Sequence, residues 1–207
     1  DFNKESNLLE LGGECGALTG MFAQKLKDVK VLESSKERAN ITYNRHKNFN
    51  NLEVIVGNLH DIKLNEKFDY ITLINILKYV DEATDSEELN KSFLEDIKKY
   101  LSHKGKILIA IENKFGLKYW AGANEEHTGK IFNGIENNMD NDEIKTFGKK
   151  ELEDLLKSAG FKNINFYYPM PDHKLPKLIY SDEYLPGAGE IFDVHSPNYD
   201  QERTVLF

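Results

Sequence analysis

The stretch Asn7-Leu8-Leu9-Glu10-Leu11-Gly12-Gly13-Glu14-Cys15-Gly16 begins as a short apolar run and ends in a glycine turn. Apolar residues then recur at helical spacing, at Leu18, Met21, Phe22 and Leu26. Glycines between a strand and a helix let the backbone pass close to a ligand, and the helix start offers free N–H groups. The stretch therefore predicts a strand, a ligand-binding turn and a helix, although a turn that binds nothing remains the alternative.

The same rhythm of short apolar runs and helical patterns continues through most of the chain. Such alternation is typical of βαβ units and a parallel sheet, and nearly continuous apolar strands fit burial on both faces. We therefore expect an α/β fold with a doubly wound, mostly parallel, seven-stranded sheet. The predicted strands span residues 7–11, 29–32, 52–56, 68–74, 106–111, 164–168 and 203–207, and the helices 18–26, 34–47, 85–101 and 149–159, with a capping box at Ser34 and Glu37.

Two segments, 113–147 and 169–202, lack regular patterning, and each follows a predicted strand or strand pair late in the sheet. Ligands of open α/β sheets bind beyond the carboxyl ends of the strands, so we expect these insertions to form a lid over a substrate. We expect residues 1–207 to form a single domain. The start at Asp1 and the apolar end Thr204–Phe207 suggest a domain excised from a longer chain.

Composition excludes several classes of protein. The 207 residues are 40% hydrophobic and 30% charged, with 35 acidic against 27 basic side chains and a net charge of -8. No basic run is present, which disfavours nucleic-acid binding. One cysteine excludes an internal disulfide and a cysteine-based zinc site, and no apolar run approaches the roughly 20 residues of a membrane span. We expect a cytoplasmic protein.

An acid stands at the end of the second predicted strand. Glu33 lies 17 residues after Gly16, a place where a carboxylate can accept both hydroxyls of a ribose. The glycines at 12, 13 and 16 do not have the spacing of a dinucleotide turn, and no Gly-Lys-Ser/Thr of a phosphate-binding loop follows. The pattern predicts a nucleoside cofactor of another kind.

These residues resemble the class I S-adenosylmethionine-dependent methyltransferases. Glu10-Leu11-Gly12 through Gly16 looks like the first motif of that family, and Phe68 to Asn75 looks like its fourth strand. The resemblance implies S-adenosylmethionine as cofactor and an antiparallel last strand. It also implies a methionyl site at Glu10, Gly12, Gly13, Glu14, Gly16 and Asn75, a ribose site at Glu33 and Ser34, and an adenine site at Asn58 and Leu59.

The second half resembles a narrower bacterial group of methyltransferases, found encoded with or fused to glycosyltransferases of surface polysaccharide synthesis. The likeness is carried by 111–122, by Glu126-His127-Thr128-Gly129 and by 180–186. It implies a small-molecule or glycan acceptor, methylated on an oxygen of a sugar, and a fused or neighbouring glycosyltransferase as partner.

Two residues depart from the family pattern. Glu14 replaces the middle glycine of the first motif, and Asn58 replaces an aspartate beside the adenine. A carboxylate at Glu14 either crowds the methionyl end of the cofactor or accepts a hydrogen bond from its ammonium group. A non-catalytic methyltransferase-like module is therefore one alternative, and an NAD(P)-dependent sugar-nucleotide enzyme is a second.

Methyl transfer to a hydroxyl benefits from a general base, and histidine suits this role at neutral pH. His127 with Glu126 in the first insertion is the candidate pair, with a hydrogen bond that stabilises the lid as the alternative. His60 and His173 are lesser candidates, and His46 and His103 are predicted to be plain surface residues. No metal-ligand spacing is present, so we expect a site without metal.

Overall fold

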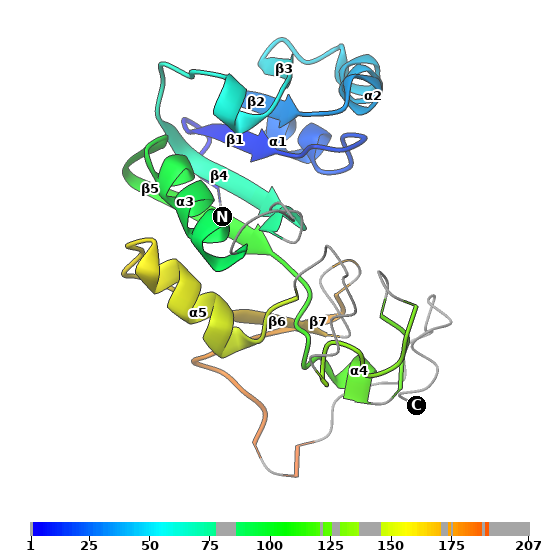
Figure 1. Ribbon diagram of the computed structural model, residues 1–207. Helices are drawn as coiled ribbons and strands as arrows, with labels where there is room; N and C mark the ends of the chain where they lie inside the picture. The colour runs from blue at the N-terminus through cyan, green and yellow to red at the C-terminus, as the bar shows by residue number, and fades with distance from the viewer. Residues whose placement is uncertain are drawn as a thin grey trace. The chain divides into compact units, whose positions relative to one another are not determined.

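The computed structural model describes residues 2–77, 86–120, 122–125, 129–136, 146–170, 174, 176–187 and 189–190 (Figure 1). The chain forms two compact units. The first consists of Asp1–Leu77 and Ser92–Ala110, and the second of Lys78–Lys91 and Ile111–Phe207. That residues 1–207 form a single domain stays a prediction.

A five-stranded parallel sheet is the centre of the first unit. It has the order β3-β2-β1-β4-β5, and Glu10 of β1 lies opposite Val31 of β2 and Thr72 of β4. The buried, mostly apolar residues of β1, β2 and β4 agree with a sheet covered on both faces. The predicted parallel α/β sheet is thus confirmed. The strands are β1 (Asn7–Leu11), β2 (Asp28–Glu33), β3 (Leu52–Val56), β4 (Phe68–Ile74) and β5 (Leu101–Ala110).

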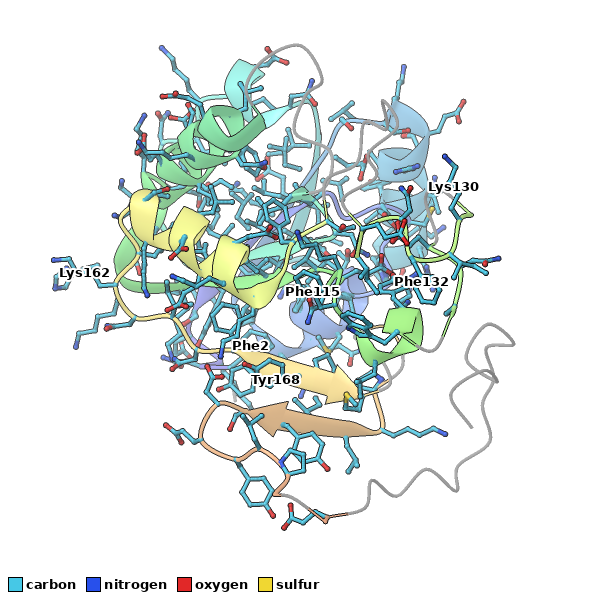
Figure 2. The ribbon with its side chains drawn as sticks, turned by 60° about the horizontal axis from the view of Figure 1, so that its bottom comes forward. Phe2, Phe115, Lys130, Phe132, Lys162 and Tyr168 are labelled. Carbon is cyan, nitrogen blue, oxygen red and sulfur yellow. The ribbon has the colours of Figure 1, made fainter. Side chains whose placement is uncertain are left out.

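Helices α1 (Thr19–Lys25) and α2 (Lys36–His46) follow β1 and β2, and α1 contacts both β2 and α2. The apolar stripe of α1 packs Phe22 onto Leu8, Val29 and Val31 of the sheet. Phe2 closes this core edge-on against the rings of Phe22 and Tyr70 (Figure 2). The first unit also contains η1 (Leu59–Asp61), and α3 (Ser86–Lys98) has residues in both units.

Several boundaries differ from the sequence prediction. Strand β6, predicted over 164–168, spans Tyr167–Met170, and the ends of β2, α1 and α3 differ by one to three residues. The cap of α2 is Ser35, whose side chain accepts from the N–H of Arg38, so the capping box predicted at Ser34 is wrong by one residue. Strand β5 begins at Leu101 instead of Lys106, through a shift in its pairing with β4. A Cβ at Gly105 would lie 2.8 Å from the carbonyl oxygen of Phe68, so glycine permits this close approach.

The second unit contains α4 (Leu117–Trp120), α5 (Lys149–Ser158), β6 (Tyr167–Met170) and β7 (Leu178–Ser181). Strands β6 and β7 pair as a separate antiparallel hairpin, although β7 lies in a segment predicted to be irregular. The described residues therefore form a five-stranded and a two-stranded sheet instead of one seven-stranded sheet. The last predicted strand, 203–207, lies outside the described residues.

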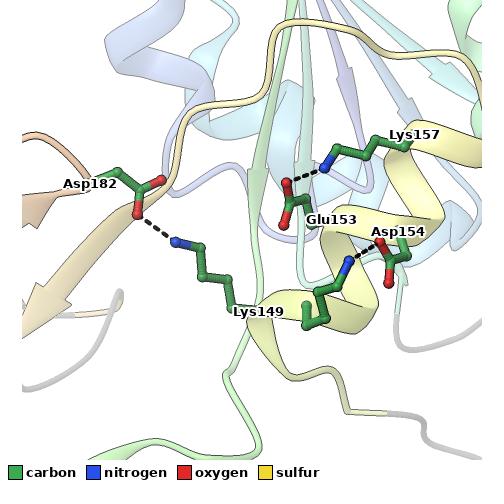
Figure 3. A network of polar contacts seen from close by, with 6 residues as sticks. Lys149, Glu153, Asp154, Lys157 and Asp182 are labelled. Atoms are coloured by element: carbon green, nitrogen blue, oxygen red, sulfur yellow. Dashed lines mark hydrogen bonds and ion pairs between the residues drawn. The ribbon is translucent and has the colours of Figure 1, made fainter.

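Lys149, the first residue of α5, joins this helix to the hairpin. Its Nζ lies 2.5 Å from Oδ1 of Asp182 (Figure 3). The same oxygen accepts the hydroxyl of Tyr168 on β6. The Lys149 ammonium, and then the Tyr168 hydroxyl, hold the pKa of Asp182 below its usual value. The pairs Glu153–Lys157 and Lys150–Asp154 lie along α5 itself (Figure 3). No helix within the described ranges is long and apolar enough to cross a membrane.

Candidate functional site

A small pocket of the first unit lies where the strand order reverses, at the carboxyl ends of β1 and β4. Parallel sheets bind ligands at such a switch point. The cavity measures about 90 Å³. Its lining consists of Glu10, Gly12, Gly13, Glu14, Ala17, Leu18, Ile74 and Asn75.

The glycine turn needs its glycines for two separate reasons. Gly12 has a φ of 65°, in the left-handed region, and a Cβ there would lie 2.2 Å from Cδ1 of Ile76. A Cβ at Gly13 would lie 2.5 Å from Cγ1 of Val31. Two side chains of the fold itself, Ile76 and Val31, therefore pack closely against Gly12 and Gly13, and the predicted close passage of the backbone to a ligand stays a prediction.

Glu14 occupies a backbone conformation that favours glycine, with a φ of 47°. A non-glycine residue in this conformation raises the free energy of the folded state by about 1–3 kcal/mol, and contacts with its surroundings must offset this strain. Here the Glu14 N–H donates to Oε2 of Glu33 over 2.8 Å, and its carbonyl accepts from the hydroxyl of Thr42 over 2.9 Å. Glu14 is exposed and is one of the residues that line the pocket.

Glu33 ends β2 with its side chain 2% exposed. Its two carboxylate oxygens accept the N–H groups of Glu14 and Ser35, over 2.8 and 2.9 Å. Glu33 is not among the residues that line the pocket, and its role at a ribose stays a prediction. The acid predicted to bind a ribose thus also orders the turn beside it.

Glu10 is the buried acid of the pocket, with 4% exposure. Its Oε2 accepts the hydroxyl of Thr19 at the start of α1, over 2.5 Å. Burial raises the pKa of Glu10 to about 7; the bond from Thr19 opposes that rise, and the nearby charge of Glu33 adds to it. Glu10 therefore changes its charge near neutral pH.

Two polar groups on β4 and at its end have unused hydrogen-bonding capacity. Oδ1 of Asn75 and Oγ1 of Thr72 are buried and have no hydrogen-bond partner among the residues that the structure describes. Asn75 lines the pocket in a left-handed conformation, with a φ of 59° and its N–H bonded to the carbonyl of Ala110. A buried acceptor without a donor is costly, so Asn75 is suited to bind a donor of a ligand.

Of the cofactor residues, the pocket brings together Glu10, Gly12, Gly13, Glu14 and Asn75, while Gly16 and Glu33 belong to the same turn region. Ser34, Asn58 and Leu59 do not line this pocket. Ser34 is exposed, Leu59 is buried in the fold, and the amide of Asn58 lies 3.4 Å from a carboxylate oxygen of Asp61.

The catalytic candidates Glu126 and His127 lie outside the described residues, as do His173 and the side chain of His60. No cluster of three metal-binding side chains occurs among the residues searched, which are those described. His103 is exposed on β5, as expected.

The prediction for His46 was wrong. This side chain is half-buried, and its Nε2 bonds the carbonyl of Gly16 over 2.8 Å. Thr19, Thr42 and Arg45 also contact the turn region or its pocket and were missed. The signal was available in part, because Thr42, Arg45 and His46 have the spacing of one helix face, but which way that face points depends on packing.

Known methyltransferases share the fold of this chain. A family model described as a methyltransferase domain matches residues 1–165. No curated protein matches the chain. The chain resembles the N-methyltransferase NodS from Bradyrhizobium japonicum WM9, solved with S-adenosyl-L-homocysteine, at 19% identity and a TM-score of 0.50. That alignment covers 57% of this chain and 58% of NodS.

Two further solved structures share the fold. An S-adenosylmethionine-dependent methyltransferase from Clostridium acetobutylicum ATCC 824 has 16% identity and a TM-score of 0.55, covering 74% of this chain and 72% of its own. The magnesium protoporphyrin IX methyltransferase from Synechocystis PCC 6803 has 12% identity and a TM-score of 0.58, covering 79% and 68%. Since the family model spans most of the chain, this protein belongs to the methyltransferase domain family.

Proposed function

We propose that this protein is an S-adenosylmethionine-dependent methyltransferase. The observation that carries the proposal is the pocket at the switch point, in which a glycine turn, two acids and an unpartnered amide oxygen converge. Membership of the methyltransferase domain family and the fold shared with methyltransferases support it.

The charges of the pocket suit this cofactor. Among the described residues that line it, Glu10 and Glu14 are carboxylates and none is basic. S-adenosylmethionine carries a sulfonium and an ammonium group, and carboxylates favour such cations. In our proposal the turn from Gly12 to Gly16 lies under the methionyl part and Glu33 binds the ribose. Ser34 assists at the ribose, and Asn58 and Leu59 flank the adenine.

Calorimetry with S-adenosyl-L-homocysteine tests the cofactor site. Glu33→Ala should weaken binding by about 1–3 kcal/mol, because it removes a charged acceptor of hydrogen bonds. Glu37→Ala, an exposed acid in the first turn of α2, is the matched control and should leave the affinity unchanged. Equal affinities in both variants would place the ribose elsewhere.

A non-catalytic methyltransferase-like module is the second candidate. The small volume of the cavity, about 90 Å³, favours it. This candidate predicts no binding of the cofactor or its demethylated product at millimolar concentration. Such a result with folded protein would overturn the enzymatic proposal.

For the acceptor we propose an oxygen on a sugar or a sugar-linked molecule, bound by the insertions 113–147 and 169–202. Aromatic rings in these segments support the proposal, since aromatic faces can stack on sugar rings, and Phe115, Trp120 and Tyr184 are exposed. Phe115 and Trp120 stack with centroids 6.5 Å apart, and Tyr180 and Tyr184 with centroids 6.4 Å apart. A fused or neighbouring glycosyltransferase would supply this acceptor.

The cofactor supplies the reactive methyl carbon, and the protein aligns the acceptor with it and removes the proton of the hydroxyl. We propose His127, oriented by Glu126, as the base. His127→Ala should lower turnover by about 10²- to 10⁴-fold without changing cofactor affinity, whereas His103→Ala should be neutral. The assay measures S-adenosyl-L-homocysteine released with sugar nucleotides, glycans and amines as acceptors. Full activity of His127→Ala would remove this residue from the mechanism, and turnover with amines alone would contradict the oxygen acceptor.

A further inference from the structure

Helix α2 holds the glycine turn through three consecutive carbonyl groups, each bonded by a different side chain. A carbonyl oxygen only accepts hydrogen bonds, so the imidazole nitrogen of His46 is the donor in its bond. The three bonds run from Thr42 Oγ1 to the carbonyl of Glu14 (2.9 Å), from Arg45 Nη1 to that of Cys15 (2.9 Å), and from His46 Nε2 to that of Gly16 (2.8 Å).

These donors share one face of α2 because residues three and four apart are neighbours on a helix. The contact is tight as well as polar. A Cβ at Gly16 would lie 3.0 Å from both Thr42 Cγ2 and His46 Nε2, and a Cβ at Gly20 only 2.6 Å from His46 Cε1. The imidazole thus fits against the turn and the start of α1 at once, and both glycines make room for it.

The turn needs such support because its conformation is strained. Glu14 and Gly16 both have positive φ angles, and Glu14 has a side chain that disfavours this region. The N–H of Glu14 is held by Glu33 from β2, and its carbonyl is held by Thr42 from α2. Both backbone polar groups of the strained residue are therefore bound from outside the turn.

We propose that Thr42, Arg45 and His46 are positioning residues that hold the turn in its ligand-binding conformation. This inference rests on the cofactor site proposed above. The three carbonyl oxygens are directed to α2, so the turn does not need to reorganise when the cofactor binds. A site that is already ordered before binding loses less conformational entropy when the ligand binds, and its affinity for the ligand is therefore higher.

Thr42→Val tests this most cleanly, since it keeps the shape of a buried side chain and removes only its hydroxyl. We expect the dissociation constant for S-adenosyl-L-homocysteine to rise about 3- to 10-fold, the size of one lost hydrogen bond. Thr42→Ser restores the donor and should restore the affinity. Arg45→Gln should weaken binding, whereas Arg38→Gln, with the same charge change two turns earlier on α2, should not.

Hydrogen exchange of the backbone amides in 14–17, measured without ligand, separates positioning from general stability. In Thr42→Val these amides should exchange faster while those of β1 and β4 keep their protection. A variant with a lower melting temperature but unchanged affinity and unchanged local exchange would overturn the positioning role. If the unmodified chain binds no cofactor, the proposed function fails. If it binds and Thr42→Val binds equally well, only the role of α2 fails.

Discussion

The charge of Glu10 is decided by its surroundings. The carboxylate is buried on the α1 face of the sheet, between Val31 and Thr72, with Thr19 as its hydrogen-bond donor and Glu33 as the nearby charge that raises its pKa. Burial raises the pKa from 4.5 to about 7. The folded chain therefore binds a proton at Glu10 over a pH range in which the unfolded chain has released it.

Because of this difference in proton binding, the free energy of unfolding depends on pH. Because the folded state holds the proton more tightly, the free energy of unfolding falls as pH rises from about 4.5 to about 7. Glu10→Gln removes the titration, and its amide oxygen can still accept from Thr19. Relative to the wild type, the variant should gain stability over this range, on the order of 3 kcal/mol in total.

Urea unfolding of both proteins at several pH values measures the effect. Glu37→Gln, at the exposed start of α2, should leave the pH dependence unaltered. Parallel stability curves for the wild type and Glu10→Gln would show that Glu10 does not titrate between these pH values.

Among the elements, α1 depends on a residue far from it in the sequence. The side-chain amide of Asn51 donates to the carbonyls of Ala23 and Leu26, each over 2.9 Å, and so satisfies the end of the helix. The last carbonyls of a helix lack partners within the helix, so these two bonds take the place of a cap supplied by a residue next to the helix end.

Asn51→Ala should lower the free energy of unfolding by about 1–3 kcal/mol, because two half-buried carbonyls lose their donor. Asn51→Asp should cost at least as much, since an ionised carboxylate cannot donate. Asn44→Ala is the control, because its amide bonds only the carbonyl of Asn40 on the exposed side of α2. Chemical denaturation compares the three, and equal stability of Asn51→Ala and Asn44→Ala would contradict the capping role.

Across the whole molecule, ligand binding and folding are linked. A ligand that binds only the folded state at 100 times its dissociation constant stabilises it by about 2.7 kcal/mol. For a chain of this size, S-adenosyl-L-homocysteine should then raise the unfolding temperature by roughly 5–10 °C. Differential scanning calorimetry measures this shift, which Glu33→Ala should reduce at the same ligand concentration. An unchanged midpoint for the wild type would argue against a cofactor site.

Prediction and structure agree where a feature depends on residues that are neighbours in the sequence, and they differ where it depends on contacts between distant residues. Strands β1, β3 and β4 have the predicted bounds, because a continuous apolar run ended by glycine or a polar residue is a local pattern. Strand β7 was missed, because its residues gain their regularity from pairing with β6. The pocket acids Glu10 and Glu14 were found from the glycines beside them, whereas Thr42, Arg45 and His46 depend on how α2 packs.

The sequence by itself determined the parallel α/β class, the glycine turn at the end of β1 and the acid at the end of β2. These features can be recognised because apolar runs, glycines and strand ends are patterns of residues that are neighbours in the sequence. Only the tertiary structure decided that the pKa of Glu10 rises to about 7, that Glu33 holds the strained Glu14, and that α2 binds three carbonyls of the turn. The physical reason is that burial, hydrogen-bond partners and electric fields arise between residues that the chain separates and the fold brings together.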